Sequence, residues 1–251
     1  MRISFFEEFP TPENLAPLRF VTWKPKLYLA CPSIKEFSEV ERSLEPHKKQ
    51  LGELVYWPVL KKKEGYWVSP FSRQKALQRI FQELQKEVVP VLLDLELPTS
   101  QNVLLLGTEL LHFTANKQLI REFIASYYGE VYLAEYSPGN DNHEKLLEWL
   151  GLHFQHKNVY VVKMLYHSMH NFTEAFLRNH LEQGRKVFGK KYIPAFGTIA
   201  AGMQGNEPRL SLEQLKKDLA IAREQKMKEV IIFRLGGLTK EYAHLLARFA
   251  D

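Results

Sequence analysis

Short apolar runs alternate with amphipathic stretches along the whole chain. The runs are rich in the β-branched, aromatic and leucine residues typical of buried strands. In the stretches between them, apolar residues recur every three or four positions, which is the spacing of a helix with one buried face. We count eight such pairs, with strands predicted at residues 3–8, 26–31, 53–60, 88–98, 130–136, 158–166, 192–196 and 229–235.

Residues that commonly cap helices mark where the helices should begin. Thr11 stands before Pro12, Ser211 stands three residues before Gln214 as in a capping box, and Asn171 and Thr239 are the other candidate caps. Helices are predicted after Thr11, over residues 33–50, from 72, in two pieces within 102–128, over 143–152, 171–184 and 211–226, and from 239.

Eight strand-helix units with no linker or break in composition predict an α/β fold: a single (β/α)8 TIM barrel over residues 1–251. The main alternative is an open, doubly wound sheet. A dinucleotide-binding fold of that kind would carry a glycine-rich phosphate loop after its first strand, and the residues after Glu8 contain none.

The fourth predicted strand contains an unusual feature, two acids at the end of a buried run. The stretch 88–98 reads VVPVLLDLELP, and Asp94 and Glu96 stand two apart in it. Residues at i and i+2 of a strand point to the same face. Unpaired buried carboxylates cost several kcal/mol or more, so the two must be paired, protonated or placed in a wet cleft. This pattern is typical of an active site.

The carboxyl ends of the strands are where a TIM barrel holds its active site. Acids and aromatic residues predominate at the predicted strand ends, a composition that suits a polyhydroxylated substrate such as a sugar, because carboxylates accept hydroxyl hydrogen bonds and rings pack on sugar faces. The catalytic candidates are Glu96, Asp94, Glu135 and Tyr166. The substrate-binding candidates are Glu8, Tyr56, Trp57, Tyr136, His167 and Arg234.

The paired acids could divide the work of a glycosidase. A neighbouring carboxylate raises the pKa of one acid, which leaves a protonated general acid beside an ionised partner, and Glu135 on the next strand is a further partner. The structural alternative is that Asp94 is bonded to Arg234 or Lys163 inside the barrel. Successive residues of a strand point to opposite faces, so only one of Glu7 and Glu8 should face into the barrel. The same holds for Tyr166 and His167.

Two short motifs resemble a known family. Asp94-Leu95-Glu96 resembles the end of the DxE signature of glycoside hydrolase family 18, and Met164-Leu165-Tyr166 resembles that family's M-x-Y. The resemblance implies that Glu96 is the general acid, that Asp94 orients the N-acetyl group of a substrate and that Tyr166 helps to hold it. Leu92 and Val89 stand where the family's longer motif has acids, so the resemblance implies a broader glycosidase-like barrel.

Two other functions fit the same pattern. Glu96, Glu135 and His167 on neighbouring strands could hold a divalent ion, as in metal-dependent sugar isomerases or epimerases, although no HxH or HExxH motif supports this. A barrel that binds a glycan or a protein without turnover is the other alternative. We expect an enzyme that binds a carbohydrate and needs no cofactor or metal. The sequence does not determine its oligomeric state.

Composition removes several classes of function. The net charge of +5 is spread along the chain, and the run Lys61-Lys62-Lys63 is too short for a nucleic-acid surface. The single cysteine, Cys31, allows no internal disulfide. The amino terminus lacks the apolar core of a signal peptide, and no run is long enough to span a membrane. These features predict a cytoplasmic protein with no membrane or nucleic-acid partner.

Overall fold

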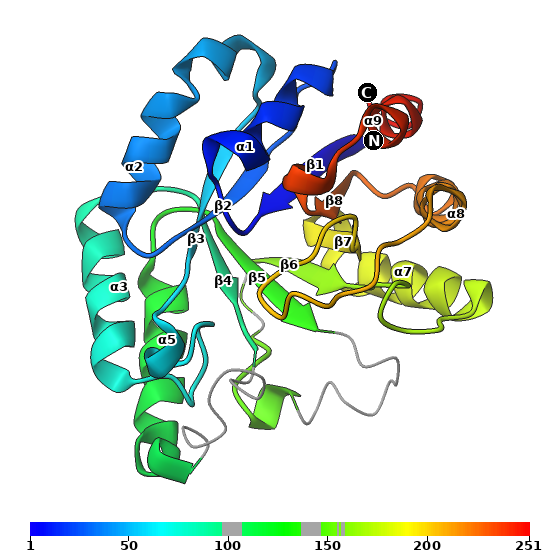
Figure 1. Cartoon of the computed structure of the whole chain (residues 1–251). Coiled ribbons are helices and arrows are strands. Elements are labelled where there is room, and N and C mark those ends of the chain that lie inside the picture. The colour runs from blue at the N-terminus through cyan, green and yellow to red at the C-terminus, as the bar shows by residue number, and fades with distance from the viewer. Residues whose placement is uncertain (97–106, 137–146, 155, 157–158) are drawn as a thin grey trace.

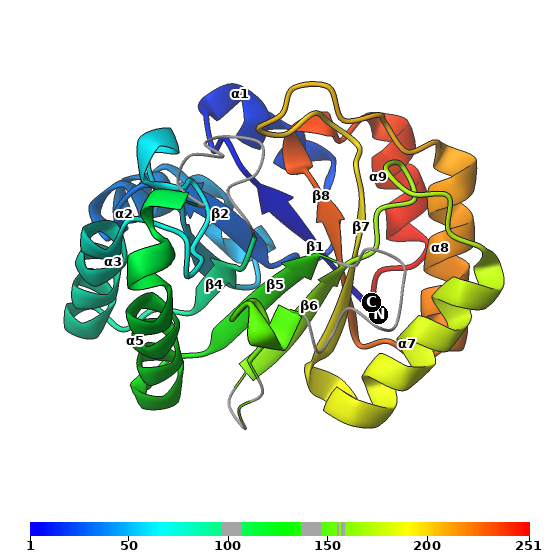
Figure 2. The ribbon, with the colours of Figure 1, turned by 90° about the horizontal axis from the view of Figure 1, so that it is seen from below.

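Eight parallel strands close into a barrel in chain order, as the sequence predicts (Figure 1). The computed structural model describes residues 1–96, 107–136, 147–154, 156 and 159–251, and of Tyr136 it describes only the backbone. The ring closes between β1 and β8, where Phe5 pairs with Ile232. The main helices lie on the outside of the ring (Figure 2). The protein therefore has the (β/α)8 TIM-barrel fold.

The strands and helices have the following bounds. The strands are β1 (Arg2–Glu7), β2 (Leu27–Cys31), β3 (Leu54–Pro58), β4 (Val91–Asp94), β5 (Val131–Tyr136), β6 (Val159–Met164), β7 (Tyr192–Gly197) and β8 (Glu229–Phe233). The helices are α1 (Pro12–Leu15), α2 (Ile34–Ser43), α3 (Gln74–Lys86), α5 (Phe113–Ser126), α7 (Glu174–Phe188), α8 (Leu212–Glu224) and α9 (Lys240–Ala247). Short 3₁₀ helices cover Ala16–Phe20, Glu45–Gln50, Lys62–Glu64, Leu110–His112, Gly189–Lys191 and Leu235–Gly237.

Most predicted caps are confirmed. The side chains of Thr11, Ser211 and Thr239 each accept a hydrogen bond from a backbone N–H in the first turn of α1, α8 and α9. The prediction for Asn171 was wrong, because Thr173 caps α7 by accepting from the Phe176 N–H. A Thr cap satisfies one of the free N–H groups of the first turn, so α7 starts only after it.

Some predicted boundaries were also wrong. The helix expected over residues 33–50 ends at Ser43 and continues as a 3₁₀ helix, in which Pro46 stands near the start. Proline has no N–H to donate back to the preceding turn, so the α-helix cannot run through it. The predicted helix starts at 102 and 143 lie outside the described residues, as do the last two residues of the predicted fourth strand.

Alternation along the strands separates two apolar layers. Phe6, Trp57, Leu92, Ala134 and Met164 belong to the cluster that fills the barrel. Their strand neighbours belong to the larger cluster between the strands and the helices. Helix α3 shows how this outer layer is built: its five buried residues repeat at three and four, and Phe81 stacks on Phe123 of α5 with ring centroids 4.2 Å apart. The barrel thus presents a fixed set of side chains at its mouth.

No helix in the described part of the chain combines the length and apolar character that crossing a membrane requires.

Candidate active site

A cleft of about 370 Å³ opens at the carboxyl ends of the strands. Its aromatic walls come from β1, β3, β6 and β8 or the segments that follow them, and methionines complete them. Four carboxylates also line it. The residues that line it include Phe6, Glu8, Trp57, Trp67, Asp94, Glu96, Met164, Tyr166, Met169, Thr198, Met203, Glu207 and Phe233. An apolar cleft with a few convergent polar groups is the usual form of a ligand site.

Asp94 and Glu96 both face this cleft, as their spacing predicts. Asp94 is the last residue of β4 and is only 3% exposed, and its Oδ1 has no hydrogen-bond partner within the described residues. Burial, followed by the charges of Glu96 and Glu8, raises the pKa of Asp94 well above its ordinary value. The structural alternative for Asp94 was wrong, because Arg234 is bonded to Glu7 and Lys163 to Glu135.

Glu96 is the more accessible acid of the pair. It is partly exposed, whereas Asp94 is buried. Burial, followed by the charge of Glu8, raises the pKa of Glu96 to about 7. A carboxyl in an apolar setting near another acid holds its proton at higher pH than one in water, because the charged form loses its hydration. Glu96 can therefore carry a proton near neutral pH.

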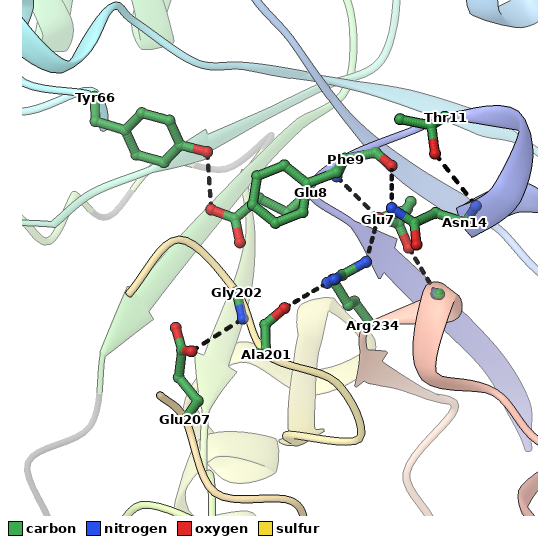
Figure 3. Close-up of polar contacts among 11 residues, drawn as sticks. Glu7, Glu8, Phe9, Thr11, Asn14, Tyr66, Ala201, Gly202, Glu207 and Arg234 are labelled. Atoms are coloured by element: carbon green, nitrogen blue, oxygen red, sulfur yellow. Dashed lines mark hydrogen bonds and ion pairs between the residues drawn. The ribbon is translucent and has the colours of Figure 1, made fainter. Parts of the chain in front are cut away.

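Glu8, the residue after β1, enters the same cleft, and the Tyr66 hydroxyl donates a hydrogen bond to it over 2.8 Å (Figure 3). The pKa of Glu8 is raised to about 7, first by burial and further by the charge of Glu207. Its neighbour Glu7 points to the opposite face, where it accepts hydrogen bonds from Arg234 at 2.9 Å and from the Gly236 N–H at 2.7 Å. The predicted split of the two acids is confirmed.

Glu207 is a fourth acid that the sequence analysis missed. It lies on the loop after β7, where its carboxylate accepts hydrogen bonds from the backbone N–H groups of Gly202 and Gln204, both over 3.1 Å. The same loop is held to β8 because the Arg234 Nε donates to the Ala201 carbonyl over 2.8 Å (Figure 3). A loop acid has no strand periodicity to reveal it. The only available signal was the glycine-bearing stretch 197–208 itself.

Glu135 does not face the cleft, so its predicted place beside Glu96 was wrong. Ala134 lines the cleft, and alternation turns Glu135 to the outer face of β5. There its carboxylate meets His153 Nδ1 at 2.7 Å and Lys163 Nζ at 2.9 Å, and all three side chains are buried. Burial alone would raise the pKa of Glu135, but His153 and Lys163 together hold it below its ordinary value. Glu135 is part of a buried ion network.

Two further candidates also lie outside the cleft. Tyr56 is on the outer face of β3, with its ring centroid 5.3 Å from that of Phe37 on α2. His167 lies 2.9 Å from Asp218 through its Nδ1, and Asp218 outweighs burial and raises the pKa of His167. Strand alternation explains the outcome for Tyr56, since its neighbour Trp57 lines the cleft. His167 lies in the turn after β6, next to Tyr166, which lines the cleft.

The remaining candidates have different outcomes. Arg234 does not line the cleft but supports Glu7 and the loop after β7. The Tyr136 side chain lies outside the described residues, so its role stays a prediction.

The residues of the alternative metal site are not brought together. Glu135 and His167 each have another partner, away from Glu96. Among the described residues, no group of three or more His, Cys, Asp or Glu side chains is arranged to hold a metal ion. The arrangement at the cleft is instead one of carboxyls of differing proton affinity beside aromatic rings.

Comparison with known proteins identifies the fold rather than a sequence family. No protein-family model matches the chain, and no curated relative matches it. Among solved structures, a GH18 chitinase from Pseudoalteromonas aurantia matches with a TM-score of 0.58 and 9% identity over 99% of this chain and 100% of that one. The PgaB (BpsB) glycoside hydrolase domain from Bordetella bronchiseptica matches with a TM-score of 0.56 and 13% identity, over 99% and 97% of the two chains.

A third similar structure is the spore cortex-lytic enzyme SleL from Bacillus megaterium QM B1551. Its TM-score is 0.55 and its identity 11%, over all of this chain and 75% of that one. At such low identity these matches concern the arrangement of the backbone. The resemblance to glycoside hydrolase family 18 is thereby supported at the level of fold: the chain is a barrel similar to those of glycoside hydrolases.

Proposed function

We propose that the protein hydrolyses a glycosidic bond, with Glu96 as its general acid. The observation that carries this proposal is the position of Glu96, partly exposed in an aromatic cleft with its pKa raised to about 7. A catalytic acid works best when its pKa lies near the working pH, because it is then protonated and still able to give the proton away. Glu96 meets both conditions at neutral pH.

The proposed reaction needs one proton transfer and one water. The Glu96 carboxyl donates its proton to the bridging oxygen, the bond from that oxygen to the sugar ring breaks, and positive charge develops on the ring carbon. An ionised carboxylate nearby stabilises that charge, and Glu8, Asp94 and Glu207 are the other acids within the cleft. Water then adds to the ring carbon, and its proton restores the Glu96 carboxyl.

The walls of the cleft support a sugar substrate. Trp57, Trp67 and Tyr166 offer ring faces that pack on the apolar face of a pyranose, while the carboxyls beside them accept hydroxyl hydrogen bonds. The three similar structures add to this, because each is named as a chitinase, a glycoside hydrolase domain or a cortex-lytic enzyme. A carbohydrate is therefore the substrate class we propose.

The proposal is tested by binding and cleavage together. Wild-type protein and Glu96→Gln are screened against a panel of oligosaccharides by thermal shift, and each hit is followed by product analysis. We expect both proteins to be stabilised by the same sugar and only the wild type to cleave it, because Gln keeps the shape of Glu but has no proton to give. Glu182→Gln, at a partly exposed position on α7 away from the cleft, is the matched control and should cleave normally.

Other outcomes would select other functions. Cleavage by Glu96→Gln at the wild-type rate would contradict the role of Glu96. A sugar-dependent shift without cleavage by either protein would show a binding barrel. Loss of activity with a chelator and its return with a divalent ion would support the metal-dependent alternative, whereas the proposed mechanism predicts no chelator effect.

A further inference from the structure

Glu8 and Glu207 form a second acidic pair in the cleft, next to Asp94 and Glu96. Both lie close to Gly202: a Cβ built on that glycine would lie 2.7 Å from Glu8 Oε2 and 3.0 Å from Glu207 Oε1. Two oxygens that lie within 3.0 Å of one point are less than about 6 Å apart. Two carboxyl groups this close together form an acceptor-only pair, with which a single cation can interact.

The charge of the cleft is one-sided. Among the described residues that line it there are four acids, Glu8, Asp94, Glu96 and Glu207, and no Lys, Arg or His. The nearby Arg234 is already bonded to Glu7 and to a backbone carbonyl. The chain as a whole is basic, with a net charge of +5. The acidic cleft is therefore a local feature of the fold and does not follow from the composition of the chain.

A second cavity, at the other end of the barrel, is lined by more basic than acidic residues. Its volume is about 420 Å³, and Arg2, Lys24, Lys26, Lys190 and Lys228 line it together with two acids, Glu229 and Asp251. The two ends of the barrel thus have opposite character, and an anionic ligand would meet only carboxylates among the described charged residues of the acidic cleft.

Two buried polar atoms at the cleft have no hydrogen-bond partner in the part of the chain that the structure describes. They are Asp94 Oδ1 and Trp57 Nε1, and each side chain is only 3% exposed. Leaving a buried polar group unpaired is energetically costly, so such groups usually indicate a missing partner. A hydroxyl or ring oxygen of a ligand would be a suitable acceptor for the Trp57 N–H. This observation is independent of the acids.

From these observations we propose that the cleft takes a sugar with a free amino group, whose ammonium lies beside the carboxylates of Glu8 and Glu207. An ammonium has three donors and no acceptor, which matches a pair of acceptor-only groups. The hydroxyl and ring oxygens of the same sugar are suitable acceptors for the Trp57 N–H. An N-acetylated sugar offers one neutral N–H in place of the cation. This inference rests on the proposed function, because it places the ligand in the proposed active-site cleft, and it names amino sugars as the substrate class.

The raised pKa of Glu8 is consistent with this ligand. A bound cation favours the ionised form of a neighbouring carboxyl, so an ammonium would lower the pKa of Glu8 and offset the cost of its burial. A neutral sugar would leave that cost in place.

The test compares amino sugars with neutral sugars of the same shape. Calorimetric titration at pH 7 uses glucosamine tetramers of several linkages, each beside its fully N-acetylated form and the corresponding glucose tetramer. We expect the free-amino form to bind about tenfold more tightly or better, a difference that added salt should reduce. Glu207→Gln and Glu8→Gln should each bring the affinity ratio close to one, and Glu182→Gln should leave it unchanged. The two cleft variants guard against a local folding defect in either one.

The outcomes separate this inference from the proposed function. Equal or weaker binding of the free-amino sugars, or no binding of any sugar, would overturn it. If neutral oligomers are cleaved without any preference for an amino group, the substrate class fails and the hydrolase proposal stands. If amino sugars bind tightly and none is cleaved, the hydrolase proposal fails and the preference for an amino sugar stands.

Discussion

Substitution of Glu8 by Gln should make the protein more stable at neutral and alkaline pH. Burial and the charge of Glu207 raise the pKa of Glu8 from 4.5 to about 7, so the folded protein binds this proton more tightly than the unfolded chain does. When the folded-state pKa of an acid is raised, stability is lost as pH rises, starting near the unfolded value and ending above the folded one. Gln has no such ionisation, and its amide oxygen can still accept the hydrogen bond from Tyr66.

The size of the effect follows from the same pKa. A tenfold difference in proton affinity is worth about 1.4 kcal/mol, so a pKa that rises from 4.5 to about 7 costs the ionised folded state on the order of 3 kcal/mol. The side chain is only 6% exposed, so solvent screening reduces this figure little. Removal of the Glu8 charge also lowers the pKa of Asp94 and of Glu96, since it is one cause of both raised values. That change acts in the same direction.

Urea unfolding at pH 5, 6, 7 and 8 measures the effect. The free energy of unfolding of Glu8→Gln relative to the wild type should rise by up to about 3 kcal/mol between pH 5 and pH 8. Glu182→Gln on α7 is the control: Lys186 lowers the pKa of Glu182, which is ionised throughout this range, so the difference between this variant and the wild type should not change with pH. Parallel stability curves for Glu8→Gln and the wild type would refute the reasoning.

The remaining predictions concern the cleft and the strand beside it. The kcat/KM for a cleaved sugar should fall as pH rises through about 7, because Glu96 must carry a proton; a rate that climbs steadily to pH 9 would contradict its role as the acid. Gly202→Ala should weaken sugar binding by calorimetry, since its methyl group would lie 2.7 Å from Glu8 Oε2 and push the loop outward; unchanged affinity would show that the loop adjusts. Glu135→Gln should reduce the free energy of unfolding by about 3–5 kcal/mol in urea, because it removes the charge that balances buried Lys163. Loss of activity by this variant without loss of stability would return Glu135 to the list of catalytic candidates.

The local features that the sequence predicted correctly depend on residues near one another in the chain. The eight strands, the caps at Thr11, Ser211 and Thr239, and the shared face of Asp94 and Glu96 all follow from spacings of a few residues. Backbone geometry alone decides these relations, because i and i+2 share a face in any strand. Boundary errors arose where a nearby residue competed, as Thr173 did with Asn171.

The errors at the site share one cause. Tyr56, Glu135 and His167 each stand one position from a residue that lines the cleft. The strand pairing shows which residues of each strand face into the barrel. Asp94 lies beside Ala134 and both face inward, so the residue after Ala134 must face outward. Applying that register to every strand would have excluded Glu135, but the register itself is a property of the closed barrel.

The sequence by itself determined the barrel and the presence of an acidic strand end, because apolar periodicity and strand alternation are local consequences of backbone geometry and of burial. Only the tertiary structure decided which acids act together. Closure of the ring placed Glu8, just after the first strand, and Glu207, on a late loop, in one cleft with Asp94 and Glu96, and it brought Arg234 to Glu7. The pairing of β5 with β6 brought Lys163 to Glu135. These partnerships join residues far apart in the chain, and their energies depend on distance and burial, which no spacing along the chain records.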